Sequence, residues 1–121
     1  MERESKYLEY KESIESDTFL KTVSAFSNYS GGTIIFGIDN ELKIIGIKDT
    51  IKALLDIENK INGNIKPNPS YELEVNKKYK TIELRIQEGQ DKPYLYKGKA
   101  YKRNDSSTIE VDRNEFIRLS L

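Results

Sequence analysis

The residues around two adjacent glycines constrain the fold of this chain more than any other feature. Apolar residues recur at helical spacing over residues 17–28, and Gly31 and Gly32 follow almost at once. Because glycine adopts the left-handed backbone conformation at little cost, this pair predicts the end of a helix. The β-branched and aromatic residues at 33–38 predict a central strand. A helix must therefore turn, within a few residues, into a buried strand.

The segments on either side of this junction predict further strands and a second helix. Residues 7–11 alternate between apolar and charged side chains, which is typical of a short strand. A polar turn at 39–41 should join the central strand to a second strand at 43–47 as a hairpin. Asp49 is placed to cap a helix whose apolar stripe ends at 62–64.

The second half of the chain predicts two more hairpins. Residues 71–75 and 81–86 alternate cleanly about a lysine-rich turn, which indicates paired strands with one face in solvent. Residues 93–96 and 99–103 lie on either side of a glycine turn and predict a third pair of short strands.

Together these elements predict a single α+β domain over residues 1–121. We expect a mixed, largely antiparallel sheet built from hairpins, two main helices and a short C-terminal helix that begins at Asp112 or Asn114. A chain of 121 residues has room for one hydrophobic core. Because residues 119–121 are still apolar at the end, we expect the domain to be the N-terminal part of a longer protein.

The composition excludes several classes of site. The chain has no cysteine and no histidine, so we expect no zinc site, no haem and no nucleophile activated by histidine. Twenty basic residues balance twenty acidic ones, which leaves no overall positive field to attract nucleic acid. No apolar run is long enough to span a membrane, and the N-terminus has no apolar signal-peptide core. We therefore expect a cytoplasmic protein without a membrane partner.

Three carboxylates form a candidate metal site. Glu4 and Glu9 precede the first helix, and Asp39 follows the central strand. Carboxylate oxygens suit Mg²⁺ or Mn²⁺, which lower the pKa of a bound water and neutralise a phosphate in the transition state. The alternative is that Glu4 and Glu9 are surface acids and that Asp39 is an ordinary turn residue.

A second candidate site is basic and aromatic. Lysine and arginine neutralise phosphates, hydroxyls add positioning bonds, and tyrosine offers a surface on which unpaired bases stack. The alternative is a hairpin that buries its tyrosines and exposes its lysines to solvent. The predicted nucleic-acid contacts are Lys11, Lys97, Lys99, Tyr101, Lys102, Arg103, Ser106 and Ser107.

The glycines do not predict ATP binding. The chain has no G-x-x-x-x-G-K-[ST] motif, and Gly31-Gly32 precedes a strand, whereas a dinucleotide-binding fingerprint opens a helix. We do not expect ATP within this domain.

Several of these motifs, in this order, resemble the AlbA-like domain of Schlafen proteins and of prokaryotic transcriptional regulators and helicase-related proteins. One departure is Asp105, where the family commonly has glycine; aspartate tolerates a left-handed turn better than most residues. The motifs are Glu4-x4-Glu9-Tyr10-Lys11, Ala25-Phe26-x-Asn28-x2-Gly31-Gly32-Thr33, Ile35-x-Gly37-Ile38-Asp39, Ile45-Gly46-Ile47, Ile65-x-Pro67, Lys92-Pro93-Tyr94 and Tyr101-x-Arg103-x2-Ser106-Ser107-Thr108.

The resemblance implies a nucleic-acid-binding domain within a larger protein, acting on DNA or RNA. In some members an acidic trio forms a metal-dependent ribonuclease site, and the matching positions here are Glu4, Glu9 and Asp39. Three hypotheses follow: an accessory nucleic-acid-binding module, an endoribonuclease dependent on Mg²⁺ or Mn²⁺, and a scaffold for protein interaction or for formation of a homodimer.

Overall fold

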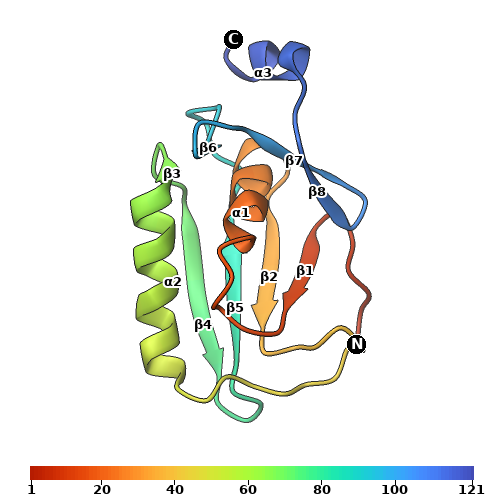
Figure 1. The fold of residues 1–121 in the computed structure, drawn as a ribbon, viewed down its shortest axis with the longest axis vertical. Coiled ribbons are helices and arrows are strands. Elements are labelled where there is room, and N and C mark those ends of the chain that lie inside the picture. The colour runs from red at the N-terminus through yellow and green to blue at the C-terminus, as the bar shows by residue number, and fades with distance from the viewer.

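A four-stranded sheet forms one layer of the domain in the computed structural model, which describes residues 1–121 (Figure 1). The strands follow the spatial order β1-β2-β5-β4, and only β1 and β2 are parallel. The predicted α+β class and mixed sheet are therefore confirmed. The four strands are β1 (Leu8–Lys11), β2 (Gly32–Phe36), β4 (Tyr71–Asn76) and β5 (Thr81–Ile86).

Two helices cover one face of this sheet and enclose the core (Figure 1). They are α1 (Phe19–Asn28) and α2 (Thr50–Asn64), and α1 is buried along almost its whole length. Alternation along β2 and β5 directs one set of side chains toward the helices and leaves a polar set on the opposite face. The buried set from the two strands is Ile34, Phe36, Ile82, Leu84 and Ile86.

The double glycine joins α1 to β2 as expected. Gly31 has a φ of +76°, and its amide donates to the Phe26 carbonyl at 2.9 Å, which closes the end of the helix. A Cβ on Gly31 would lie 2.8 Å from the Ile86 carbonyl oxygen, and one on Gly32 would lie 2.6 Å from the Phe26 ring. Both positions therefore require glycine for packing between the helix and the sheet.

The second helix and the hairpin after it also agree with the sequence pattern. Asp49 caps α2, and its carboxylate accepts from the Lys52 amide at 3.1 Å. The neighbouring strands β4 and β5 pair antiparallel and in register from Tyr71–Ile86 to Asn76–Thr81.

The predicted hairpin between residues 33–38 and 43–47 is wrong. Strand β2 has β1 on one side and β5 on the other, so neither of its edges is free. Only one bridge, between Ile38 and Ile44, remains of the expected pairing. The segment instead forms a compact loop, in which the amides of Ile45 and Gly46 both donate to the Gly37 carbonyl at 2.9 and 3.0 Å.

The predicted hairpin between residues 93–96 and 99–103 is confirmed only at its turn, where Tyr96 and Lys99 form an antiparallel bridge with backbone hydrogen bonds of 2.9 and 3.0 Å. The strands on either side have other partners. Strand β6 (Leu95–Tyr96) pairs with β3 (Ile65–Lys66), at the end of α2. Strand β7 (Tyr101–Asn104) pairs with β8 (Ser107–Glu110), so the run of hydroxyl residues begins a strand. Asp105 takes the left-handed conformation that this turn needs, with a φ of 58°.

A third helix, α3 (Arg113–Leu119), lies at the end of the molecule beyond the β7–β8 hairpin (Figure 1). The Asp112 carboxylate accepts from the Glu115 amide at 2.9 Å, which confirms one of the two predicted caps. None of the helices is both long and apolar enough to cross a membrane.

Candidate nucleic-acid interface

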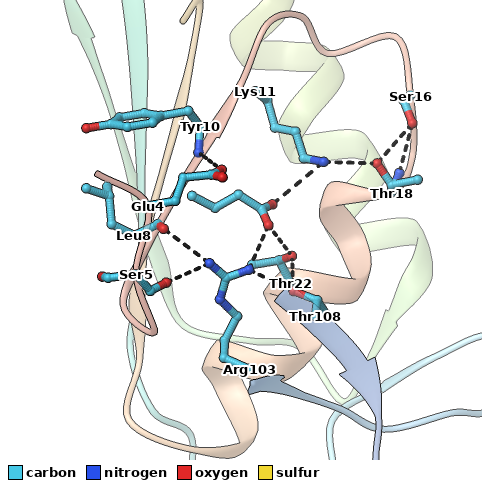
Figure 2. Close-up of polar contacts among 11 residues, drawn as sticks. Glu4, Ser5, Leu8, Tyr10, Lys11, Ser16, Thr18, Thr22, Arg103 and Thr108 are labelled. Atoms are coloured by element: carbon cyan, nitrogen blue, oxygen red, sulfur yellow. Dashed lines mark hydrogen bonds and ion pairs between the residues drawn. The ribbon is translucent and has the colours of Figure 1, made fainter. Parts of the chain in front are cut away.

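Arg103 connects the β7–β8 hairpin to the edge strand of the sheet (Figure 2). Its Nη1 donates to Glu9 Oε1 at 2.8 Å, and its Nη2 donates to the carbonyls of Ser5 and Leu8 at 2.7 and 3.1 Å. The side chains are nearly inaccessible, with 2% of Arg103 and 10% of Glu9 exposed. The chain thus uses a fork-shaped cation to hold two distant segments together.

Two threonines complete this network. Thr22 on α1 donates its hydroxyl to Glu9 Oε1 at 3.1 Å, and Thr108 on β8 accepts from Arg103 Nη1 at 3.0 Å. The two hydroxyl oxygens lie 2.7 Å apart, and because the Thr22 proton goes to Glu9, Thr108 is the donor between them. Elements α1, β1, β7 and β8 therefore meet at one buried charged cluster.

Two polar atoms of this cluster have no hydrogen-bond partner: Arg103 Nε and Glu9 Oε2. Lys11 Nζ lies 3.8 Å from that oxygen and donates a hydrogen bond to Thr18 at 3.2 Å. Glu9 and Arg103, which the sequence placed in separate metal and nucleic-acid sites, thus contact each other.

The structure does not bring the three predicted carboxylates together. Glu4 accepts from the Tyr10 amide at 2.9 Å, on the edge strand β1. Asp39 accepts from the amides of Glu41 and Lys43 at 2.9 and 2.8 Å, in the loop after β2. No group of three Asp, Glu, His or Cys side chains has metal-binding geometry. The three carboxylates are thus not assembled around one point in this structure, and a metal site that uses all three stays a prediction.

The predicted lysines differ in how they are engaged. Lys102 forms an ion pair with Glu115 of α3, and Lys99 lies 3.8 Å from Glu110. Lys97 is exposed, and its Nζ lies 5.4 Å from the centroid of the Tyr96 ring. These lysines are at least partly exposed, which agrees in part with the alternative that they form a face in contact with solvent.

The remaining predicted contacts are a buried tyrosine and two exposed serines. Tyr101 is 8% exposed, and Lys21 Nζ lies 5.8 Å from its ring centroid. Ser106 and Ser107 are exposed at the turn between β7 and β8.

A cavity of about 380 Å³ opens between the N-terminal turn, the end of α1 and the β7–β8 hairpin. Three basic side chains line it, Lys6, Lys102 and Arg103, and no carboxylate does. Its aromatic side chains are Phe26, Tyr7 and Tyr29.

Sequence reasoning missed Lys6, Tyr7 and Tyr29 in this site. Parallel pairing of β1 with β2 brings them together, because the Thr33 amide donates to the Tyr7 carbonyl at 2.9 Å. The only local signal was the basic-aromatic pair Lys6-Tyr7 in front of a strand.

Helix α3 sets the electrostatics at the rim of the cavity. Tyr29 donates its hydroxyl to Glu115 Oε2 at 2.7 Å. The hydrogen bond from Lys102, with a smaller contribution from Tyr29, lowers the pKa of Glu115. Burial, and next the hydrogen bond to Glu115, raise the pKa of Tyr29. The tyrosine therefore stays protonated and Glu115 stays ionised at neutral pH.

The model of the family described as Schlafen, AlbA_2 matches residues 4–112. The chain belongs to this family. Contacts in the structure explain two of the motif residues: Glu9 is held by Arg103 and Thr22, and Asn28 binds the Tyr94 amide and carbonyl at 2.6 and 2.9 Å.

Three similar proteins differ in how much of their length the chain matches. The uncharacterized ATP-binding protein UU034 of Ureaplasma parvum is 37% identical in an alignment 78 residues long, which covers 59% of this chain and 22% of that protein. The crystal structure of the DIP2311 protein from Corynebacterium diphtheriae superposes with a TM-score of 0.66 at 19% identity, over 93% of this chain and 26% of that one.

The third relative is a single domain. The solution structure of the N-terminal domain of a RecG-related helicase protein from Nitrosomonas europaea superposes with a TM-score of 0.64 at 21% identity, covering 88% of this chain and 83% of that domain. At these identities the two structures show the shared fold. The chain spans 22% of the Ureaplasma protein and 26% of the Corynebacterium protein.

Proposed function

We propose that this Schlafen AlbA_2 domain binds nucleic acid as an accessory domain of a transcriptional regulator or helicase-related protein. The observation that carries the proposal is the lining of the cavity beside β7 and β8. In a chain with no net charge, three basic and three aromatic side chains meet there without a carboxylate. Membership of the family and the fold shared with a domain of a helicase-related protein support it.

Two of the basic side chains are placed to contact phosphate. Lys6 is exposed and belongs to no ion pair within the chain. Lys102 is half-buried and paired with Glu115, so a phosphate must compete with that carboxylate. Arg103 already makes four hydrogen bonds, and it shapes the cavity wall. We therefore assign the main phosphate contact to Lys6.

The test is a fluorescence-anisotropy titration of labelled DNA and RNA oligonucleotides at several salt concentrations. For a single strand, the logarithm of the association constant should fall against the logarithm of salt with a slope of about −0.7 per phosphate contacted. Lys6→Gln should weaken binding and make this slope shallower by about one contact.

Lys77→Gln is the matched control. Lys77 is an exposed lysine without an ion pair in the turn between β4 and β5, at the end of the sheet opposite Gly32. Binding that is insensitive to salt, or equal loss in the two variants, would contradict this interface.

A further inference from the structure

The cavity has the size of a site for one small ligand. Its volume of about 380 Å³ lies at the low end of the range that holds small organic ligands, about 300 to 1,000 Å³. The β7–β8 hairpin packs on α1 on one side, and the N-terminal turn lies on the other (Figure 1). The space fits one nucleotide better than a base pair.

The aromatic side chains are arranged from exposed to buried. Tyr7 is 53% exposed at the mouth of the cavity, although it lies next to a paired strand. Tyr29 is half-buried, and Phe26 is fully buried beneath the Arg103 guanidinium, 5.5 Å from its ring centroid. An aromatic ring left in solvent beside a cavity offers a stacking surface for a base.

The charged groups of the cavity wall differ in whether a ligand can reach them. Arg103 is 8% exposed, and its Nε is buried without a partner inside the charged cluster, so the guanidinium shapes the wall and does not reach into the cavity. Lys6 is exposed and has no ion pair within the chain, so its ammonium is free to contact an anionic group of a ligand. An aromatic ring beside a free cation matches a base joined to a phosphate.

From these observations we propose that the cavity binds one unpaired nucleotide of a single-stranded nucleic acid. The base stacks on Tyr7, and the adjoining phosphate contacts Lys6. This inference rests on the proposed nucleic-acid-binding function and names its substrate class. A base in a duplex reaches such a cavity only after it unstacks and unpairs, which costs a few kcal/mol.

The experiment measures four ligands by anisotropy or by competition: a labelled single-stranded octanucleotide, the duplex of the same sequence, and the free mononucleotides AMP and ATP. The single strand should bind more tightly than the duplex and than either mononucleotide. Tyr7→Ala should weaken single-strand binding about tenfold, as expected for the loss of one stacked base. Tyr7→Phe, which keeps the ring, should bind like the unmodified chain.

Tyr79→Ala is the matched control. Tyr79 is 44% exposed in the turn between β4 and β5, and its removal should leave single-strand binding unchanged. Circular dichroism of each variant checks that it is folded.

Several results would overturn the proposal, and they can be told apart. If Lys6→Gln weakens binding but Tyr7→Ala does not, the nucleic-acid interface stands and the base site is wrong. Equal affinity for duplex and single strand also rejects the base site. If AMP or ATP binds as tightly as the oligonucleotide, the ligand is a free nucleotide. If no oligonucleotide binds, both proposals fail.

Discussion

Arg103 is buried against a carboxylate, two backbone carbonyls and a threonine, and this determines what it can do. Its partner Glu9 lies 94 residues away in the chain. A pattern of neighbouring residues cannot reveal such a pair, so the sequence assigned Glu9 to a metal and Arg103 to phosphate. In the structure each neutralises the other.

We expect Arg103→Met to lower the free energy of unfolding by about 3 to 5 kcal/mol, because it leaves Glu9 buried without a counter-ion. Urea denaturation followed by circular dichroism measures the change. The double variant Glu9→Met/Arg103→Met should lose less stability, since no unpaired charge remains.

Arg3→Met is the control for this loss, because Arg3 is exposed and should change stability by less than about 0.5 kcal/mol. The opposite outcome is an Arg103→Met variant that is as stable as the unmodified chain but no longer binds nucleic acid. That result would show that Arg103 is a phosphate contact.

At the scale of elements, the sequence predicted local structure well and strand partners less well. The end of α1, the cap of α2 and the β4–β5 hairpin depend on glycine conformation, capping and alternation over a few residues. The partner of β2 depends on which strands already occupy its edges, which is a property of the whole sheet. The β7–β8 hairpin was missed because its serine run suggested ligand contacts rather than a strand.

Helix α3 provides a test at this scale, because it is held to the body by Glu115. The pKa of this carboxyl is lowered by Lys102 and then by Tyr29. Its contribution to stability is therefore present above the unfolded-state pKa of about 4.3 and is lost as pH falls through the lower folded-state value. Glu115→Gln should cost up to about 1 kcal/mol at pH 7, since the ion pair is partly exposed.

Urea unfolding of the two proteins at pH 7, 5 and 3 measures this dependence. The difference between them should be similar at pH 7 and 5 and should shrink at pH 3. Glu110→Gln is the control, because Glu110 is an exposed acid 3.8 Å from Lys99 and should have little effect at any of the three. A difference that grows toward low pH would contradict the assignment.

Across the whole molecule, acidic and basic residues are equal in number but not evenly placed. Carboxylates gather on the outer face of the sheet, where Glu72, Glu74 and Glu83 surround Arg85. The cavity beside β7 and β8 has only basic charges in its lining. Two of these charges are neutralised, Arg103 by Glu9 and Lys102 by Glu115, so Lys6 is the one basic side chain of the lining without a counter-ion. Binding should therefore rely on short-range contacts more than on long-range attraction.

The same distribution makes a prediction about metal ions. Glu9 is paired with Arg103, while Glu4 and Asp39 accept hydrogen bonds from backbone amides in different segments. A metal held by all three must break these contacts and move a loop, which reduces its net affinity.

A ligand that binds only the folded state stabilises it by RT ln(1 + [L]/Kd), so the melting temperature rises with the ligand concentration. We expect no such rise for MgCl₂ or MnCl₂ up to about ten-millimolar concentrations, beyond the effect of CaCl₂ at equal ionic strength. A rise specific to Mn²⁺ that Asp39→Asn abolishes would show that the three carboxylates converge in solution, and would make manganese-dependent cleavage of structured RNA the next assay.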